Sequence, residues 1–211
     1  MVRFLILRHG ISVGNEKGVF SGQVDVPLSD VGRKQAQDAC DYVLKNYKVD
    51  AIYASDLSRA ISTVTPASVQ LGIPINTKTA FREIDTGVWC DVRVDTVKAT
   101  YPKEYEAYAS WDEYAPLGGK ESFHDVRERA RVALEELAKK HDGQTVLIGA
   151  HGGIVITLGA FYLGISYKEF RLTKKVTNAS LTVIEFENGV GKVVELARCD
   201  YLKDYKSAAE V

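Results

Sequence analysis

The sequence is poor in cysteine, and the cysteines that it has are scattered. It contains only three, Cys40, Cys90 and Cys199, and no two of them form a CxxC pair. An odd, widely spaced set does not build a disulfide framework, and it lacks the ligand spacing of a zinc site. We therefore expect reduced thiols in a cytoplasmic protein.

The chain also lacks an excess of charge of one sign and a long apolar run. Its 211 residues include 27 lysines and arginines against 28 aspartates and glutamates, a formal net charge of −1. This balance creates no overall field for nucleic acid or a membrane surface, so we expect neither as a partner. The apolar run at residues 4–7 is too short for a signal peptide or a membrane span. Any anion site must therefore be local.

Two common nucleotide signatures are missing. The chain has no GxxxxGK[ST] loop and no GxGxxG segment that opens a helix after a strand. The sequence therefore does not indicate phosphate binding by a P-loop or dinucleotide binding by a Rossmann turn.

Apolar runs alternate with amphipathic segments along most of the chain. We predict strands at residues 2–7, 50–54, 75–79 and 145–150, helices at 29–47, 57–71 and 123–137, and a hairpin of 181–186 with 193–197 around Asn188-Gly189. This alternation predicts an α/β fold with three layers. Its sheet would be mostly parallel, with helices on both faces and an antiparallel edge.

Residues 88–120 interrupt the alternation with a dense group of aromatic side chains. The group comprises Trp89, Tyr101, Tyr105, Tyr108, Trp111 and Tyr114. We interpret the segment as a partly helical, lid-like insertion within a single domain spanning residues 1–211. Simple core packing of a helical cap is the alternative interpretation.

Two apolar strands far apart in the sequence end in the same way, as FLILRHG and as VLIGAHGG. Because the exits of parallel strands lie at one edge of a sheet, His9 and His151 are predicted to meet there. Arg8 would repel a metal cation, and a metal centre would need further ligands, so we favour anion binding or nucleophilic catalysis. Alternatively, each histidine is satisfied locally. His124 and His141 are predicted to be surface residues.

The segment Arg8-His9-Gly10, followed by Ser12 and Asn15, resembles the signature of the histidine phosphatase superfamily, the phosphoglycerate mutase-like fold. The ordered match covers nearly the whole chain. It continues through Phe20-Ser21-Gly22, Asp25-Val26-Pro27-Leu28-Ser29, Gly32, Gln35-Ala36, Tyr53-Ala54-Ser55-Asp56-Leu57-Ser58-Arg59-Ala60, Arg82-Glu83-Ile84-Asp85-Thr86-Gly87-Val88-Trp89, Gly119-Lys120-Glu121-Ser122, Ala150-His151-Gly152-Gly153 and Asn178-Ala179-Ser180.

The resemblance implies a role for each matched site residue. His9 would be the nucleophile, Arg8 and Arg59 would hold the phosphoryl oxygens, and His151 would donate to them. Glu83 would be the general acid, with Asp85 as the lesser candidate. The implied substrate-binding residues are Asn15, Ser12, Gly10, Gly22 and Gly152. These protein donors would replace a metal, so we expect no metal and no other cofactor.

Two details resemble the phosphatase branch of this family. Glu83 is followed by Ile-Asp-Thr-Gly where mutases typically have Arg-His-Tyr-Gly, and His151 is followed by Gly-Gly where they have Gly-Asn. We therefore expect hydrolysis of a small phosphorylated metabolite through a phosphohistidine. A cofactor-dependent phosphoglycerate mutase and a non-catalytic module that binds a phosphorylated ligand are the alternatives. The sequence does not identify the phosphomonoester, and it leaves a homodimer possible.

The sequence also departs from the phosphatase pattern. Trp89 is followed by Cys90-Asp91 where these phosphatases continue with Glu-Gly, so the turn at residue 91 lacks its usual glycine. Spare cations for a substrate carboxylate are few in the insertion. Arg93 and Lys98 are the obvious ones in its first part.

Overall fold

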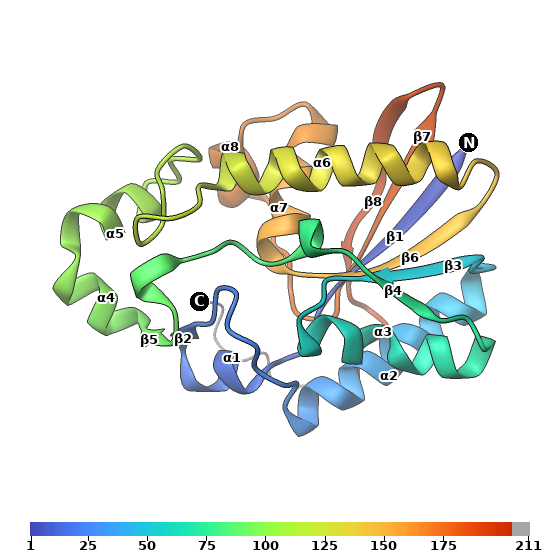
Figure 1. Ribbon diagram of the computed structural model, residues 1–211, viewed down its shortest axis with the longest axis horizontal. Helices are drawn as coiled ribbons and strands as arrows, with labels where there is room; N and C mark the ends of the chain where they lie inside the picture. Colours follow the sequence, from blue (N-terminus) through green and yellow to red (C-terminus); the bar gives the residue numbers. More distant parts are fainter. Residues whose placement is uncertain (204–211) are drawn as a thin grey trace.

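A six-stranded sheet runs through the centre of the computed structural model, which describes residues 1–203 (Figure 1). The strand order is β4-β3-β6-β1-β7-β8. Neighbouring strands are parallel from β4 to β1, whereas β7 and β8 form an antiparallel edge. The bounds are β1 (Val2–Arg8), β3 (Ala51–Ala54), β4 (Ile75–Thr77), β6 (Thr145–Ala150), β7 (Leu181–Glu187) and β8 (Val190–Arg198). The predicted fold class is confirmed.

Helices cover both faces of this sheet. One face carries α2 (Asp30–Asn46) and α3 (Ser58–Leu71), and the other carries α6 (Phe123–Lys140), α7 (Gly152–Leu163) and α8 (Tyr167–Thr173). Alternate side chains of β1 enter the two cores, Phe4 and Ile6 on the α6–α7 side and Leu5 and Leu7 on the other. Because both faces are covered, the central strands are continuous apolar runs.

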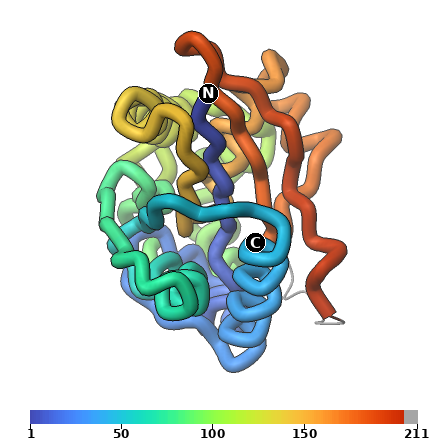
Figure 2. Tube along the Cα trace, turned by 90° about the vertical axis from the view of Figure 1, so that its right-hand side faces the viewer, coloured from blue at the N-terminus to red at the C-terminus, as the bar shows by residue number. Residues whose placement is uncertain are grey.

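The antiparallel hairpin lies at one edge and leaves β1 in the interior. Figure 2 shows β1 in dark blue near the middle of the molecule, with β7 and β8 in orange to red at its right. The hairpin strand predicted at 193–197 is longer, because β8 begins directly after the Asn188-Gly189 turn. The strand predicted at 75–79 is shorter, because a 3₁₀ turn, η1 (Thr79–Phe81), takes over at its end.

The aromatic insertion folds into short elements beside the carboxyl edge of the sheet. They are η2 (Gly87–Trp89), β5 (Val92–Arg93), α4 (Val94–Thr100) and α5 (Pro102–Ala109). β5 pairs with β2 (Val19–Phe20), a short strand that follows α1 (Val13–Lys17). The turn before β5 contains Asp91 with a φ of 60°, in the left-handed region that glycine usually occupies. The chain thus keeps this backbone conformation without the glycine.

The prediction that His141 is a surface residue is wrong. It ends α6 and is only 8% exposed, with its ring bonded to the Tyr53 hydroxyl at 3.0 Å and to Gln144 Oε1 at 2.6 Å. The chain turns there from α6 into β6, which folds the ring inward over β3. His124 is half-buried and lies against Tyr114.

The described residues also bear on membrane crossing and on the extent of the predicted domain. Within residues 1–203, no helix combines the length and the apolar character that crossing a bilayer requires. The predicted single domain runs to residue 211, and its last part, residues 204–211, lies outside the described residues.

Candidate active site

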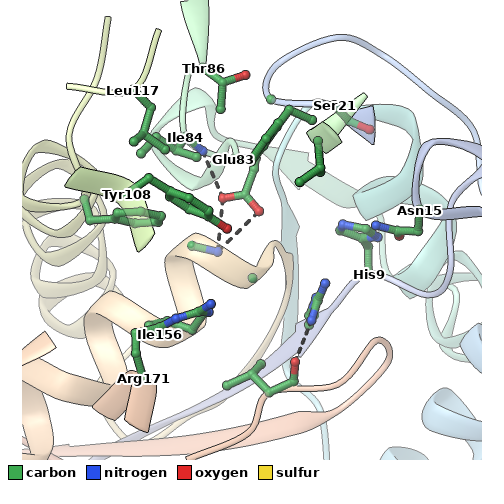
Figure 3. Close-up of a pocket in the computed structure, with 18 of the residues that line it drawn as sticks. His9, Asn15, Ser21, Glu83, Ile84, Thr86, Tyr108, Leu117, Ile156 and Arg171 are labelled. Carbon is green, nitrogen blue, oxygen red and sulfur yellow. Dashed lines mark hydrogen bonds between the residues drawn. The ribbon is translucent and has the colours of Figure 1, made fainter. Parts of the chain in front are cut away.

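A cavity of about 460 Å³ lies at the carboxyl ends of β1 and β6, beneath the insertion (Figure 3). Its lining brings together most of the predicted site residues, namely Arg8, His9, Ser12, Asn15, Gly22, Arg59, Glu83 and Gly152. They come from strand ends, loops and helix N-termini, because the parallel strands all finish at this edge.

His9 and His151 meet as the two matching strand exits predicted. β1 and β6 are parallel neighbours with Arg8 opposite Ala150, and the backbone N–H of His9 donates to Ala150 O at 2.9 Å. The two imidazole rings lie edge to face, with their centroids 5.2 Å apart. The sheet register therefore sets the relative position of the two rings.

His9 is held as a neutral ring with a defined tautomer. Its Nδ1 lies 2.7 Å from the carbonyl oxygen of Gly10. A carbonyl oxygen only accepts, so Nδ1 carries the proton and Nε2 keeps its lone pair. Burial, then Arg59 and Arg8, holds the pKa of His9 well below its ordinary value of 6.5. At neutral pH Nε2 therefore keeps an unprotonated lone pair.

Asn15 is oriented by its own helix cap. Its Oδ1 accepts from the backbone N–H of Ser12 and from Ser12 Oγ, both at 3.0 Å, in a capping box that starts α1. Because the oxygen is occupied, the amide NH₂ is the end that donates toward the cavity, where Figure 3 shows Asn15 beside His9. Ser12 thus orients Asn15 as well as lining the cavity.

Asn178 supports the same region, a role that the sequence did not indicate. Its Nδ2 donates to the carbonyl oxygen of His9 at 3.1 Å and to Asn15 Oδ1 at 3.3 Å. The next residue, Ala179, donates its backbone N–H to the same His9 oxygen. The available signal was the Asn-Ala-Ser triplet in the family match, which gave the position but not the contact.

Arg59 is buried and held by two backbone carbonyls. It is 1% exposed, and its Nη1 and Nη2 donate to Val24 O and Gly22 O, both at 2.8 Å. Burial lowers the pKa of Arg59 below its ordinary value, yet the guanidinium remains charged at neutral pH. Gly22 has a φ of 47°, and a Cβ there would come within 2.5 Å of Thr86 Oγ1. This position therefore requires glycine.

Arg8 is anchored in the same way on the other side of His9. Its Nη1 donates to Val176 O at 2.5 Å. Two guanidinium groups with fixed planes thus face one neutral imidazole, an arrangement suited to the oxygens of a phosphoryl group.

The side chain of Glu83 reaches the first turn of α7. Its Oε1 accepts from the backbone N–H groups of Ile84 at 2.9 Å and Gly153 at 3.0 Å. Asp85, the lesser candidate, instead accepts from Gly87 N in a turn and does not line the cavity. Arg82, a possible ion-pair partner of Glu83, is bonded to Asp56. The carboxylate of Glu83 is therefore the one in the cavity.

His151 is enclosed and neutral. It is fully buried, and neither ring nitrogen has a hydrogen-bond partner among the described residues. Burial, then Arg59 and His9, holds its pKa well below 6.5. A buried ring without partners is costly unless a ligand supplies one. His151 is not among the described residues that line the cavity, and its ring lies against that of His9, which is.

Two of the predicted glycines lie in different surroundings. Gly152 begins α7 in the cavity wall, where a Cβ would lie 3.3 Å from Arg8 Nε. Gly10 does not line the cavity. It packs on the first turn of α2, where a Cβ would lie 2.4 Å from Gly32 O. Within residues 1–203, no group of three His, Cys, Asp or Glu side chains converges as metal ligands do.

Comparison with known proteins places the chain beside phosphatases. The model of the histidine phosphatase superfamily (branch 1) matches residues 4–198. Phosphoserine phosphatase 1 of Hydrogenobacter thermophilus is 28% identical, over 93% of this chain and 92% of that protein. A metal-independent phosphoserine phosphatase of Arabidopsis thaliana is 31% identical, over 89% and 78%. The structure of Bacillus stearothermophilus YhfR superposes with a TM-score of 0.90 at 26% identity, covering 95% of this chain and 99% of that one.

Proposed function

This chain belongs to the histidine phosphatase superfamily and is a phosphomonoesterase, and on that premise we propose that it hydrolyses its substrate through a phosphohistidine on His9. The observation that carries the proposal is the neutral His9 ring, with Nε2 free of its proton, between Arg8 and Arg59. The substrate is a small phosphorylated metabolite, since the cavity of about 460 Å³ is of small-molecule size.

In the first step, Nε2 of His9 attacks phosphorus. The N–P bond forms as the P–O bond to the leaving group breaks, and protonated Glu83 gives its proton to the departing oxygen. Arg8, Arg59, Asn15 and the ring of His151 donate to the phosphoryl oxygens as their charge redistributes. The protein's own donors thus do the work that a metal ion does in many phosphoryl-transfer enzymes.

In the second step, water takes the place of the leaving group. The carboxylate of Glu83 removes a proton from the water as its oxygen bonds to phosphorus. The N–P bond then breaks, which releases inorganic phosphate and returns His9 to its neutral form and Glu83 to its protonated form. The insertion at residues 88–120 closes over the cavity as a lid, and the enzyme works in the cytoplasm with its three cysteines reduced.

The test is release of phosphate from an aryl phosphate in the presence of EDTA. We expect turnover by the wild-type protein and a loss of on the order of 10³-fold or more in kcat for His9→Ala. His124→Ala, which changes a half-buried histidine outside the cavity, is the control. Quenching with denaturant at alkaline pH, with labelled substrate, should trap a phosphoprotein in the wild type and none in His9→Ala. Subsequent acid treatment should release the label, as expected for a phosphohistidine. Near-normal turnover by His9→Ala, or a strict requirement for added metal, contradicts the proposal.

A parallel assay separates hydrolysis from mutase activity, in which the phosphoryl group is transferred back to the bound acid. With 3-phosphoglycerate as substrate, inorganic phosphate and 2-phosphoglycerate are measured together. We expect phosphate as the product. Efficient isomerisation stimulated by the bisphosphate would instead assign the chain to the mutases.

A further inference from the structure

A third arginine faces the cavity from the side opposite the phosphoryl site. Arg171, on α8, lines the same cavity as His9, and Figure 3 shows it across from His9 and Asn15. Its guanidinium carbon lies 4.1 Å from the ring centroid of Trp111, a residue of the insertion. The indole face fixes the plane of the guanidinium while leaving its edge available.

The described part of the chain leaves Arg171 without an acidic partner. No carboxylate within residues 1–203 lies at ion-pair distance, and the buried Nε has no hydrogen bond there. A guanidinium held partly out of water is stabilised by an anionic partner, because desolvation of its charge is costly. Arg171 is therefore available to bind an anion that the described residues do not supply.

The charges that line the cavity are unequal. Its described lining contains the cations Arg8, Arg59, Arg171, Lys174 and Lys175, and Glu83 as the only carboxylate. The phosphoryl group accounts for Arg8 and Arg59 under the proposed function. The positive charge of Arg171 and Lys174 then lies on the side of the leaving group. Arg93 and Lys98, the spare cations predicted from the sequence, do not line the cavity.

We propose that Arg171 binds a carboxylate on the leaving group, so that the preferred substrates are small phosphorylated carboxylic acids. The inference rests on the proposed function, since it takes the phosphoryl position from it. A planar guanidinium fork matches a planar carboxylate in a two-bond contact. The neighbouring rings of Tyr108 and Trp111 exclude water and strengthen that contact. Lys174 adds positive charge at the cavity mouth.

The experiment compares substrates that differ only in the carboxylate. Phosphoserine is paired with phosphoethanolamine, and 3-phosphoglycerate with glycerol 3-phosphate. For wild type we expect kcat/KM to favour the carboxylate member of each pair by about tenfold or more, the effect of one hydrogen bond to a charged group. Arg171→Met keeps an unbranched apolar stem over Trp111, and we expect it to bring each ratio close to one by raising KM. Arg171→Lys should restore part of the preference.

Lys168→Met is the matched control, because Lys168 is an exposed cation of the same helix that does not line the cavity. It should leave the ratios unchanged. Turnover of an aryl phosphate, which has no carboxylate, tests the proposed function separately. The inference is overturned if wild type shows no preference within the pairs, or if Arg171→Met slows both members equally. A preference for bisphosphates over both members of each pair would also overturn it.

Discussion

Glu83 and Gly153 are joined by a backbone hydrogen bond that depends on glycine having no side chain. The Gly153 N–H lies 3.0 Å from Glu83 Oε1, and a Cβ on Gly153 would lie 2.3 Å from the same oxygen. No side chain fits between the helix and the carboxylate, so Gly153 controls where Glu83, the proposed general acid, lies. The Gly-Gly that distinguishes this chain from the mutase pattern thus has a direct geometric effect.

Gly153→Ala is predicted to displace Glu83 while leaving the helix intact, because alanine is a good helix former. Turnover of alkyl phosphates, whose leaving groups need protonation, should fall by about 10²-fold. Turnover of an aryl phosphate should fall much less. Glu83→Gln should show the same contrast between substrates. Equal losses on both substrates, or a large drop in the thermal unfolding temperature of Gly153→Ala, would point to general disruption instead.

Acid is predicted to destabilise the protein through His9 and His151. In the unfolded chain each has its ordinary pKa of 6.5, whereas in the folded chain burial and the nearby arginines lower the pKa. Below pH 6.5 the unfolded state therefore binds more protons, and stability is lost as the pH falls toward the folded pKa. The slope is up to about 1.4 kcal/mol per pH unit for each histidine.

The measurement is urea unfolding in phosphate-free buffer between pH about 7.5 and about 5.5. His151→Gln should flatten the dependence of the unfolding free energy on pH, and His124→Gln is the control. If the unfolding free energy of His151→Gln depended on pH as steeply as that of the wild type, His151 would not be the cause of the acid sensitivity.

Arg59→Lys is predicted to impair both binding and folding. A lysine ammonium cannot reach Val24 O and Gly22 O together while presenting a fork to the phosphoryl oxygens. We expect kcat/KM to fall by about 10²-fold and the unfolding free energy by about 1–3 kcal/mol, since buried carbonyls lose donors. Arg33→Lys, at an exposed pair with Asp30, is the control. Vanadate should inhibit Arg59→Lys more weakly than the wild type. Equal inhibition of the two proteins would contradict a role of Arg59 in binding the phosphoryl group.

Asp91 is predicted to tolerate glycine better than alanine. At a φ of 60°, alanine has a steric cost of about 1–2 kcal/mol, whereas glycine has none and aspartate is intermediate. The free energies of unfolding of Asp91→Ala and Asp91→Gly, measured by chemical denaturation, should therefore differ by about 1 kcal/mol, with the glycine variant more stable. Equal stabilities would mean that the turn relaxes when the side chain changes.

Local sequence patterns were sufficient to predict the helices and strands whose apolar residues recur with one clear period. The buried strand β1 and the amphipathic helix α6 stand out, and the parallel-strand rule alone brought His9 to His151. α7 was not predicted, because residues 152–160 are buried on all sides and give no amphipathic stripe. His141 was misplaced for a related reason. A helix-end histidine gives no local sign that the chain will turn it inward.

The support of the site could not be predicted from the sequence because it depends on contacts between distant segments. Asn178 reaches the carbonyl of His9 from a loop near the far end of the chain. Arg171 meets Trp111 only when α8 and the insertion are brought together across the cavity. The resemblance supplied the position of the first and gave no indication of the second.

Arg171, near the end of α8, and Asn178, in the connection that follows this helix, lie close together in the sequence. Between them, Val176 holds Arg8 through its carbonyl oxygen, and Asn178 holds the backbone of His9. A longer connection between α8 and Asn178 would therefore shift Arg8 and His9 relative to Arg171. New substrate preferences in this lineage should arise by exchange of side chains on α8 at constant length, and variation in length should be confined to segments such as the insertion that do not hold the backbone of His9.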